Sequence, residues 1–231
     1  KKSHIATLIV FFVLIPLTLI VGSRLSGRAF YVTSTLVIVE LLIPFFLAFE
    51  GRRPQARELV VLAVMCALAV AGRVAIPIPS FKAIFGIIMI AGIAFGPESG
   101  FLVGAISALA SNFFYSQGPY TPWQMMAYGA GGMLAGFVFA QGRLPRKPVI
   151  MGIFGFLAVA FFVGPLLDTC SVFLVMSRIS LKGAMAFYIS GFPVNLRQAV
   201  ATAIVLLVLG KPLLEKLDRI KTKYGILDDE R

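Results

Sequence analysis

The stretch AVMCALAVAGRVA, residues 63–75, decides how this chain is organised. Small side chains recur in it at every fourth position: Ala63, Ala67, Ala71 and Ala75. On a helix they form one smooth stripe, and in a membrane such a stripe lets a second helix approach closely, because lipid gives helices no hydrophobic reason to pair. The stripe ends beside Arg73 and is followed by IPIPSF, residues 76–81, whose two prolines predict a stiff loop.

The composition predicts a polytopic membrane protein. Of the 231 residues, 59% are hydrophobic and only 13% are charged, and the mean hydropathy is +0.94. The net charge of +11 would suggest nucleic acid in a soluble protein. Here the charges lie in short segments between apolar runs, which favours a role in topology and in contact with anionic lipid headgroups, and no nucleic-acid partner is expected.

Apolar runs long enough to cross a bilayer repeat along the chain. The eight predicted spans are residues 5–21, 30–49, 58–75, 83–95, 99–115, 123–140, 149–167 and 193–209. The first is too long for a cleaved signal and lacks a small-x-small cleavage site. The segment 168–192 is interrupted by Arg178 and Lys182, and we interpret it as an extension of the seventh span followed by an interfacial loop. A further full span is the alternative.

Lysine and arginine placement predicts that both termini are cytoplasmic, in a multi-pass protein of the cell membrane. Eight spans bring most of the basic residues to one side: Lys1, Lys2, Arg52, Arg53, Arg57, Arg143, Arg146, Lys147 and the cluster at 211–223. The loops 76–81 and 116–122 and the segment 168–192 then share the outer face.

Motifs for catalysis are absent from the sequence. The single histidine is His4, and the chain has no HExxH and no GxxxxGK[ST] phosphate loop. Cys66 and Cys170 fall in different apolar segments without a CxxC pair. We therefore expect a protein that is not an enzyme, with no metal site and no cofactor.

Four ionisable residues fall within apolar segments: Glu40, Arg73, Asp168 and Arg197. Charges at membrane depth are costly, so such residues usually face an interior or a cavity. Arg73 and Arg197, with Asn195 beside it, are candidates for an outward-opening substrate pocket. The alternative is that either arginine pairs with Asp168 or extends to the interface. Glu40 has no assigned role.

Amide and aromatic residues surround the loop SQGPYTP, residues 116–122. The candidate substrate-binding residues there are Asn112, Tyr115, Tyr120, Trp123 and Gln124. Interfacial anchoring also explains tyrosine and tryptophan at such positions, but it does not explain the two amides. Aromatic and amide side chains converging on an apolar site suit a small organic ligand. Phe81, Lys82 and Tyr188 complete the predicted rim.

From about residue 53 to 209 the sequence resembles the substrate-binding S component of an energy-coupling factor (ECF) transporter. The alanine stripe carries the resemblance together with GRVAIPIPSFKA, FGPESGFLVGAISALASNFF and GPYTPWQMMAYGAGGMLAG. Within that family the chain looks most like the cobalamin-type S components.

The resemblance implies an all-helical membrane bundle with a six-helix substrate-binding core, residues 51–211. Two extra transmembrane helices precede it at residues 1–50, and a cytoplasmic basic tail follows at 212–231. It also implies that the alanine stripe docks on a transmembrane T subunit driven by two cytoplasmic ABC ATPases, and that the substrate is a vitamin, cobalamin or a related corrinoid. The alternatives are an S component for another vitamin or nucleoside-like nutrient, or a stand-alone secondary transporter. Spacing alone leaves internal packing of the stripe open as well.

Overall fold

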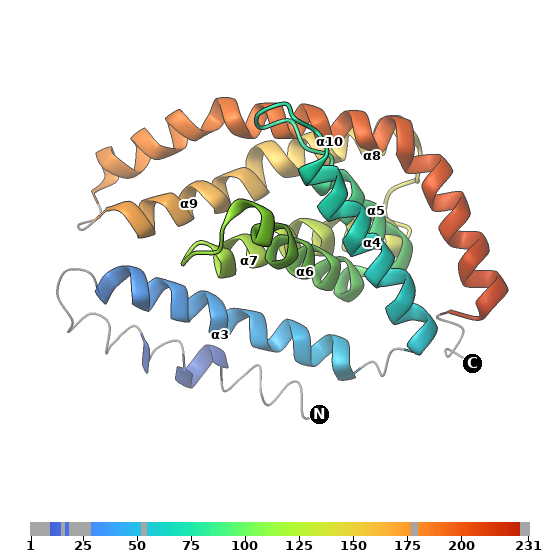
Figure 1. Cartoon of the computed structure of the whole chain (residues 1–231), viewed down its shortest axis with the longest axis horizontal. Coiled ribbons are helices and arrows are strands. Elements are labelled where there is room, and N and C mark those ends of the chain that lie inside the picture. Colours follow the sequence, from blue (N-terminus) through green and yellow to red (C-terminus); the bar gives the residue numbers. More distant parts are fainter. Residues whose placement is uncertain (1–9, 15–16, 19–28, 52–54, 177–179, 227–231) are drawn as a thin grey trace.

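The computed structural model describes residues 10–14, 17–18, 29–51, 55–176 and 180–226, and within these every regular element is a helix (Figure 1). The all-helical prediction is confirmed. Two of the described helical stretches, Pro148–Val175 and Leu181–Tyr224, are long and apolar enough to cross a membrane. The predicted first span, at 5–21, lies largely outside the described residues.

Helix α5 (Ile84–Phe95) forms the centre of the bundle. All of its residues are buried, as expected for a helix that is apolar on every side. Helices α4 (Ala56–Val74), α6 (Pro97–Tyr115) and α7 (Thr121–Ala135) pack against it. Gly96, with a φ of 96°, ends α5, and Pro97 begins α6 at once, so these two helices form a tight hairpin.

Glycines let α5, α6 and α7 approach to backbone contact. A methyl group added to Gly92 or Gly100 would lie well inside van der Waals distance of the Gly132 carbonyl, and one added to Gly132 would collide with the Gly100 carbonyl. Small residues at such crossings are the usual means of close packing between membrane helices. The glycines of the sixth predicted span therefore allow close packing of α7 against α5 and α6.

The polypeptide from Pro148 to Val175 is one helical stretch. It consists of α8 (Pro148–Ala158), a π-helical segment η3 (Val159–Val163) and α9 (Gly164–Val175). A similar segment, η2 (Gly136–Ala140), extends α7. The predicted extension of the seventh span beyond Leu167 is thus present.

Helix α10 (Leu181–Tyr224) corrects the interfacial-loop prediction for the second half of 168–192. Residues 181–192 are the first turns of α10, whose N-terminus is capped by the Ser180 hydroxyl, which accepts a hydrogen bond from the Gly183 N–H (3.2 Å). Lys182 is exposed and so does not interrupt the helix, and Pro193 lies inside it. Residues 177–179, including Arg178, lie outside the described part.

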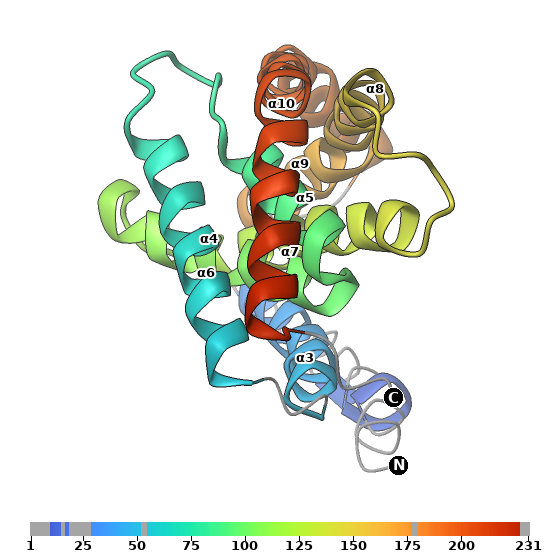
Figure 2. The ribbon, with the colours of Figure 1, turned by 90° about the vertical axis from the view of Figure 1, so that its right-hand side faces the viewer.

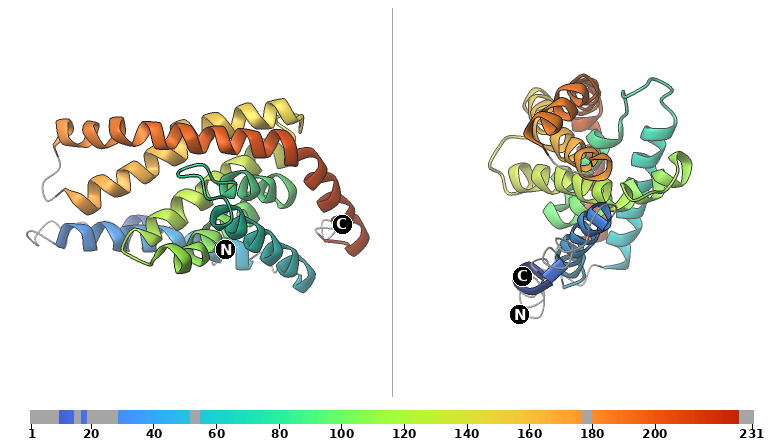
Figure 3. Two further views of the ribbon diagram at one scale, coloured as in Figure 1. Left: turned by 45° about the horizontal axis from the view of Figure 1, so that its top comes forward. Right: turned by 90° about the vertical axis from the view of Figure 1, so that its left-hand side faces the viewer.

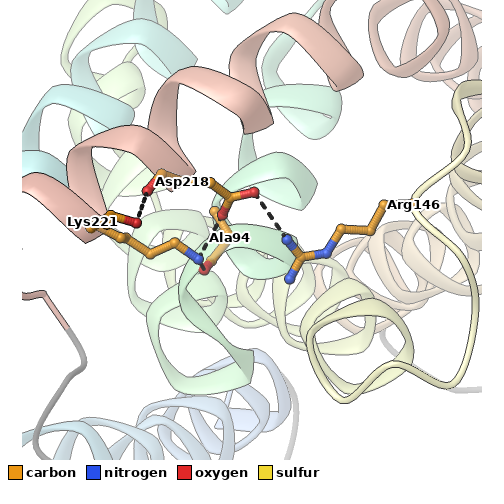
Figure 4. Close-up of polar contacts among 5 residues, drawn as sticks. Ala94, Arg146, Asp218 and Lys221 are labelled. Carbon is orange, nitrogen blue, oxygen red and sulfur yellow. Dashed lines mark hydrogen bonds and ion pairs between the residues drawn. The ribbon is translucent and has the colours of Figure 1, made fainter.

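The C-terminal part of α10, which contains Pro212, bends over one end of the bundle (Figures 1 and 2). Leu214 and Leu217 are buried in the main core, so residues after 211 pack as part of the bundle. Lys221 donates to the carbonyl of Ala94 at the end of α5 (Nζ–O 2.7 Å), where a cation suits the helix dipole (Figure 4).

Helix α3 (Ala29–Gly51) lies on the opposite side of the bundle from α10 (Figures 1 and 3). It packs against α6, α7 and α9, with Leu42 against Phe101 and Ala105. Its Glu40 accepts a hydrogen bond from Thr18. The predicted second span, at 30–49, therefore forms a helix alongside the more central helices.

We expect Gly132→Ala to lower the free energy of unfolding by about 1–3 kcal/mol, because overpacking at a backbone contact forces the helices apart. Thermal unfolding of the purified chain in detergent measures the effect. Gly51→Ala is the matched control, since nothing lies within 4 Å of a methyl group at that position. Equal melting temperatures for the two variants would contradict this account of the packing.

Candidate binding pocket and exposed alanine stripe

A cavity of about 550 Å³ opens among α4, α6, α7, α9 and α10. Its walls carry aromatic, amide and charged side chains interspersed with apolar ones. Its lining residues are Arg73, Ser80, Lys82, Ile84, Tyr115, Tyr120, Gln124, Tyr128, Leu167, Asp168, Cys170, Ser171, Leu174, Val175, Val194, Asn195 and Gln198. A mostly apolar cavity with a few converging polar groups is the usual form of a small-molecule site.

Arg73, in the last turn of α4, is held in place by α6. Its Nη1 donates to the Asn112 Oδ1 (2.9 Å) and to the Ser111 hydroxyl. The guanidinium lies over the rings of Tyr115 (4.9 Å to the centroid) and Tyr128 (5.6 Å). Both hydrogen bonds use one nitrogen, so Nε and Nη2 have no partner among the described residues and can donate to a ligand.

Asn112 lies behind the cavity wall and forms hydrogen bonds to residues that line it. It is fully buried, and its Nδ2 donates to Gln124 Oε1 (2.8 Å) and to Thr121 Oγ1 (3.1 Å). The Thr121 hydroxyl donates in turn to Gln117 Oε1 (2.9 Å). One amide thus connects Arg73 on α4 to the first turn of α7, which explains an asparagine at this depth.

A second polar group in the cavity wall is a hydrogen-bonded pair from α9 and α10. Asn195 Nδ2 donates to Asp168 Oδ2 at 2.7 Å, and both residues line the cavity. Gly191, one turn before Asn195, leaves the space that the Asp168 carboxyl group occupies. Among the described residues Asp168 forms no ion pair, so the bridge to Arg73 or Arg197 considered from the sequence is not formed.

Six of the eleven predicted substrate-binding residues line the cavity: Arg73, Lys82, Tyr115, Tyr120, Gln124 and Asn195. Lys82 also donates to the carbonyl of Ile76, which ties the loop 75–83 together. The other five do not line it. Asn112 lies behind Arg73 and Gln124, and Phe81 is a half-buried residue of the adjoining loop.

The remaining three point elsewhere. Trp123 is buried and stacks on Phe173, with centroids 5.4 Å apart. Tyr188 shares a hydrogen bond with Thr169 (2.8 Å), and Arg197 is exposed, its Nε donating to the Pro193 carbonyl (3.2 Å).

Sequence reasoning missed several lining residues, of which Ser80, Tyr128, Asp168, Ser171 and Gln198 are polar. Helical spacing could have found two of them. Tyr128 follows Gln124 by four positions and Gln198 follows Asn195 by three, so each shares a helix face with a predicted residue. Asp168 was recognised as an ionisable residue within an apolar segment but was not placed in the site.

The alanine stripe lies on the outside of the bundle. Ala63, Ala67, Ala71 and Ala75 are all exposed, whereas Met65 and Ala69 of the same helix are buried. A groove of about 500 Å³ runs between this face and α6, lined by Ala67, Ala71, Ala75, Ala110, Phe114 and their apolar neighbours. Packing of the stripe within the chain, the alternative left open by its spacing, would have buried these alanines.

The family model for the ECF-type riboflavin transporter, S component, matches residues 54–215. The match covers more than half of the chain, so the chain belongs to the family of ECF S components, which are membrane proteins that bind the transported substrate. It is therefore a transport subunit and not a catalytic one. No curated protein and no solved structure matches the chain.

Replacing Asn112 with leucine should destabilise the chain by about 2–4 kcal/mol, because it leaves Arg73, Gln124 and Thr121 without their shared partner in a buried place. The midpoint of thermal unfolding in detergent measures this. Gln117→Leu is the control, since Gln117 is exposed at the end of the same hydrogen-bonded chain. The interpretation fails if the two variants unfold at the same temperature.

Proposed function

We propose that this chain is the substrate-binding subunit of an ECF-type vitamin importer and that the cavity beside Arg73 holds a flavin-sized vitamin. The observation that carries the proposal is the 550 Å³ cavity in which an arginine, an aspartate, three amides and three tyrosines converge. Its volume falls within the roughly 300–1,000 Å³ typical of pockets for drug-sized ligands.

The family description supports riboflavin as the first ligand to test. A flavin combines a flat heteroaromatic ring with carbonyl oxygens and a polyol chain. Tyr115 and Tyr128 offer ring faces, Arg73 offers donors to carbonyl oxygens, and Asp168 and Asn195 offer partners to hydroxyl groups. The cavity thus offers groups of the kinds that a flavin would need.

Cobalamin, which the sequence resemblance favours, is the second candidate. Aromatic and amide side chains suit a corrin ring and its peripheral amides. A corrinoid has roughly three times as many non-hydrogen atoms as riboflavin, so the cavity walls would have to separate to enclose it. The cobalamin assignment stays a prediction, and the cavity volume weighs against it.

The proposed arrangement in the membrane follows the sequence prediction. Six helical segments, α4, α5, α6, α7 with η2, α8 to α9, and α10, correspond to the proposed core. Helix α3 and the segment before it are the two additional spans, and both termini are cytoplasmic. The exposed alanine stripe is the proposed docking face for a T subunit, which two cytoplasmic ATPases drive.

Titration of the purified chain with riboflavin, followed by quenching of flavin fluorescence, tests the ligand. Cobalamin, cobinamide, pantothenate and folate are compared by calorimetry. We expect saturable riboflavin binding that Arg73→Gln weakens tenfold or more, in line with about 1.5–3 kcal/mol for a hydrogen bond to a charged group.

Two further variants make the ligand test decisive. Gln198→Leu changes the cavity without removing any side-chain hydrogen bond that holds the described helices together, and should also weaken binding. Lys182→Gln, at the exposed start of α10, should bind as the parent chain does. Binding of a corrinoid but not of riboflavin would reverse the order of the two candidates, and binding of neither would reject both.

Replacing Ala67 and Ala71 together with leucine should abolish vitamin uptake by cells that contain the T subunit and ATPases, while ligand binding by the purified chain is retained. Bulky side chains prevent the close helix approach that docking requires. Ala186→Leu, at an exposed alanine on α10, is the control. Uptake by the double variant would contradict docking through the stripe, and uptake by the purified chain alone in liposomes would favour a secondary transporter.

A further inference from the structure

Basic side chains gather where the loop 141–148 meets the C-terminal part of α10. The loop contributes Arg143, Arg146 and Lys147, and α10 contributes Lys211, Lys216, Arg219, Lys221 and Lys223. We call these eight residues the basic surface. Arg146 Nη1 lies 3.4 Å from Asp218 Oδ2, which joins the loop to the helix (Figure 4).

The acidic groups within this region are already engaged. Asp218 also pairs with Lys221 (2.8 Å), and Glu215 lies 3.9 Å from Lys211. Arg143, Lys147, Lys216, Arg219 and Lys223 form no ion pair with any other described residue, and all five are exposed. The surface therefore presents positive charge that the described part of the chain does not neutralise.

The fold places this charge at the edge of an apolar belt. Helices α8 and α10 run side by side, and Met151 lies against Gly210, so their residues near 149 and 209 lie at one level. From that level toward residue 157 of α8 and residue 204 of α10, both helices expose apolar side chains: Val149, Ile153, Leu157, Ile204, Leu207 and Val208. Immediately beyond it, Lys147 and Lys211 begin the basic surface.

The inward and outward faces of α10 differ sharply after Gly210. Leu214 and Leu217 are buried against the core, whereas Lys216, Arg219 and Lys223 face outward. The exposed charges extend along about 18 Å of helix. A single small anion cannot contact charges spread over that length, but a layer of lipid headgroups can.

We propose that the basic surface binds anionic phospholipid headgroups at the membrane boundary. The occupant follows from charge complementarity and from the apolar belt, which places these residues at headgroup depth. The proposal concerns a second surface, remote from the vitamin cavity, and does not rest on the identity of the vitamin. Its consequence is that the bend of α10, and with it the Lys221 contact to α5, is held more firmly in an anionic membrane.

The test measures the affinity of the full chain in a neutral detergent for a fluorescent phosphatidylglycerol and for the matching phosphatidylcholine. A lysine or arginine at a lipid surface contributes about a fivefold gain in affinity. We expect the parent chain to prefer the anionic lipid by fivefold or more. The triple variant Lys147→Gln, Lys216→Gln, Arg219→Gln removes three of the five unpaired charges and should lose most of that preference.

The variant residues are exposed and make no side-chain hydrogen bond to another described residue, so the fold should be unaffected, which the melting temperature in neutral detergent checks. Lys182→Gln, at the other end of α10, is the matched control and should keep the preference. Equal affinity for the two lipids would overturn the proposal. So would equal binding of glycerol phosphate, which would indicate a site for free phosphate.

A last test asks whether the acidic residues after 226 occupy the basic surface in place of lipid. Asp228, Asp229 and Glu230 follow the described residues in the sequence. If deleting 227–231 were required before any lipid preference appeared, this segment and not lipid would be the occupant, and the proposal would be wrong.

Discussion

Backbone contact among α5, α6 and α7 at Gly92, Gly100 and Gly132 is the constraint on which the rest of the structure depends. Without side chains at these positions the three helices come close enough to bury α5 completely. The crossing lays α6 closely alongside α7. That in turn brings Asn112 on α6 within hydrogen-bonding distance of Gln124 on α7, and this amide pair holds Arg73 at the cavity.

Helix α4 connects two surfaces of different chemistry. Its Arg73 faces inward, where amides and aromatic rings offset the cost of a charge at depth. Its alanines face outward, where they leave a groove against α6. Tyr115 joins the two, since its hydroxyl donates to the Arg73 carbonyl (3.0 Å) at the end of the helix that carries the stripe. A ligand that moves Arg73 therefore acts on the helix that carries the proposed docking face.

The sequence predicted what depends on local pattern. Apolar runs located the helices. Of the two amides flanking SQGPYTP, Gln124 lines the cavity and Asn112 lies behind it, because polar residues at membrane depth need partners. The sequence prediction was wrong where the outcome depends on which side of a helix a residue faces, or on whether a helix continues through a charged segment. Arg197 and Asn195 are two positions apart, about 200° around a helix, so only one of them can face the cavity. Residues 181–192 form a helix with the charged Lys182 on its exposed face, which the pattern of charges alone did not indicate.

Helix α3 and the last turns of α10 lie outside the part of the chain that matches the S-component family, residues 54–215. Helix α3 packs Ile38 near Trp123 and Cys170, behind the cavity wall, and the bend of α10 covers the far end of α5. A structure of the assembled transporter with its vitamin bound is the most direct test of the account. The account predicts a T-subunit helix against Ala63, Ala67 and Ala71, with the ligand beside Arg73 and Tyr128. Contact through α3 or α10, with the alanine stripe facing lipid, would contradict it.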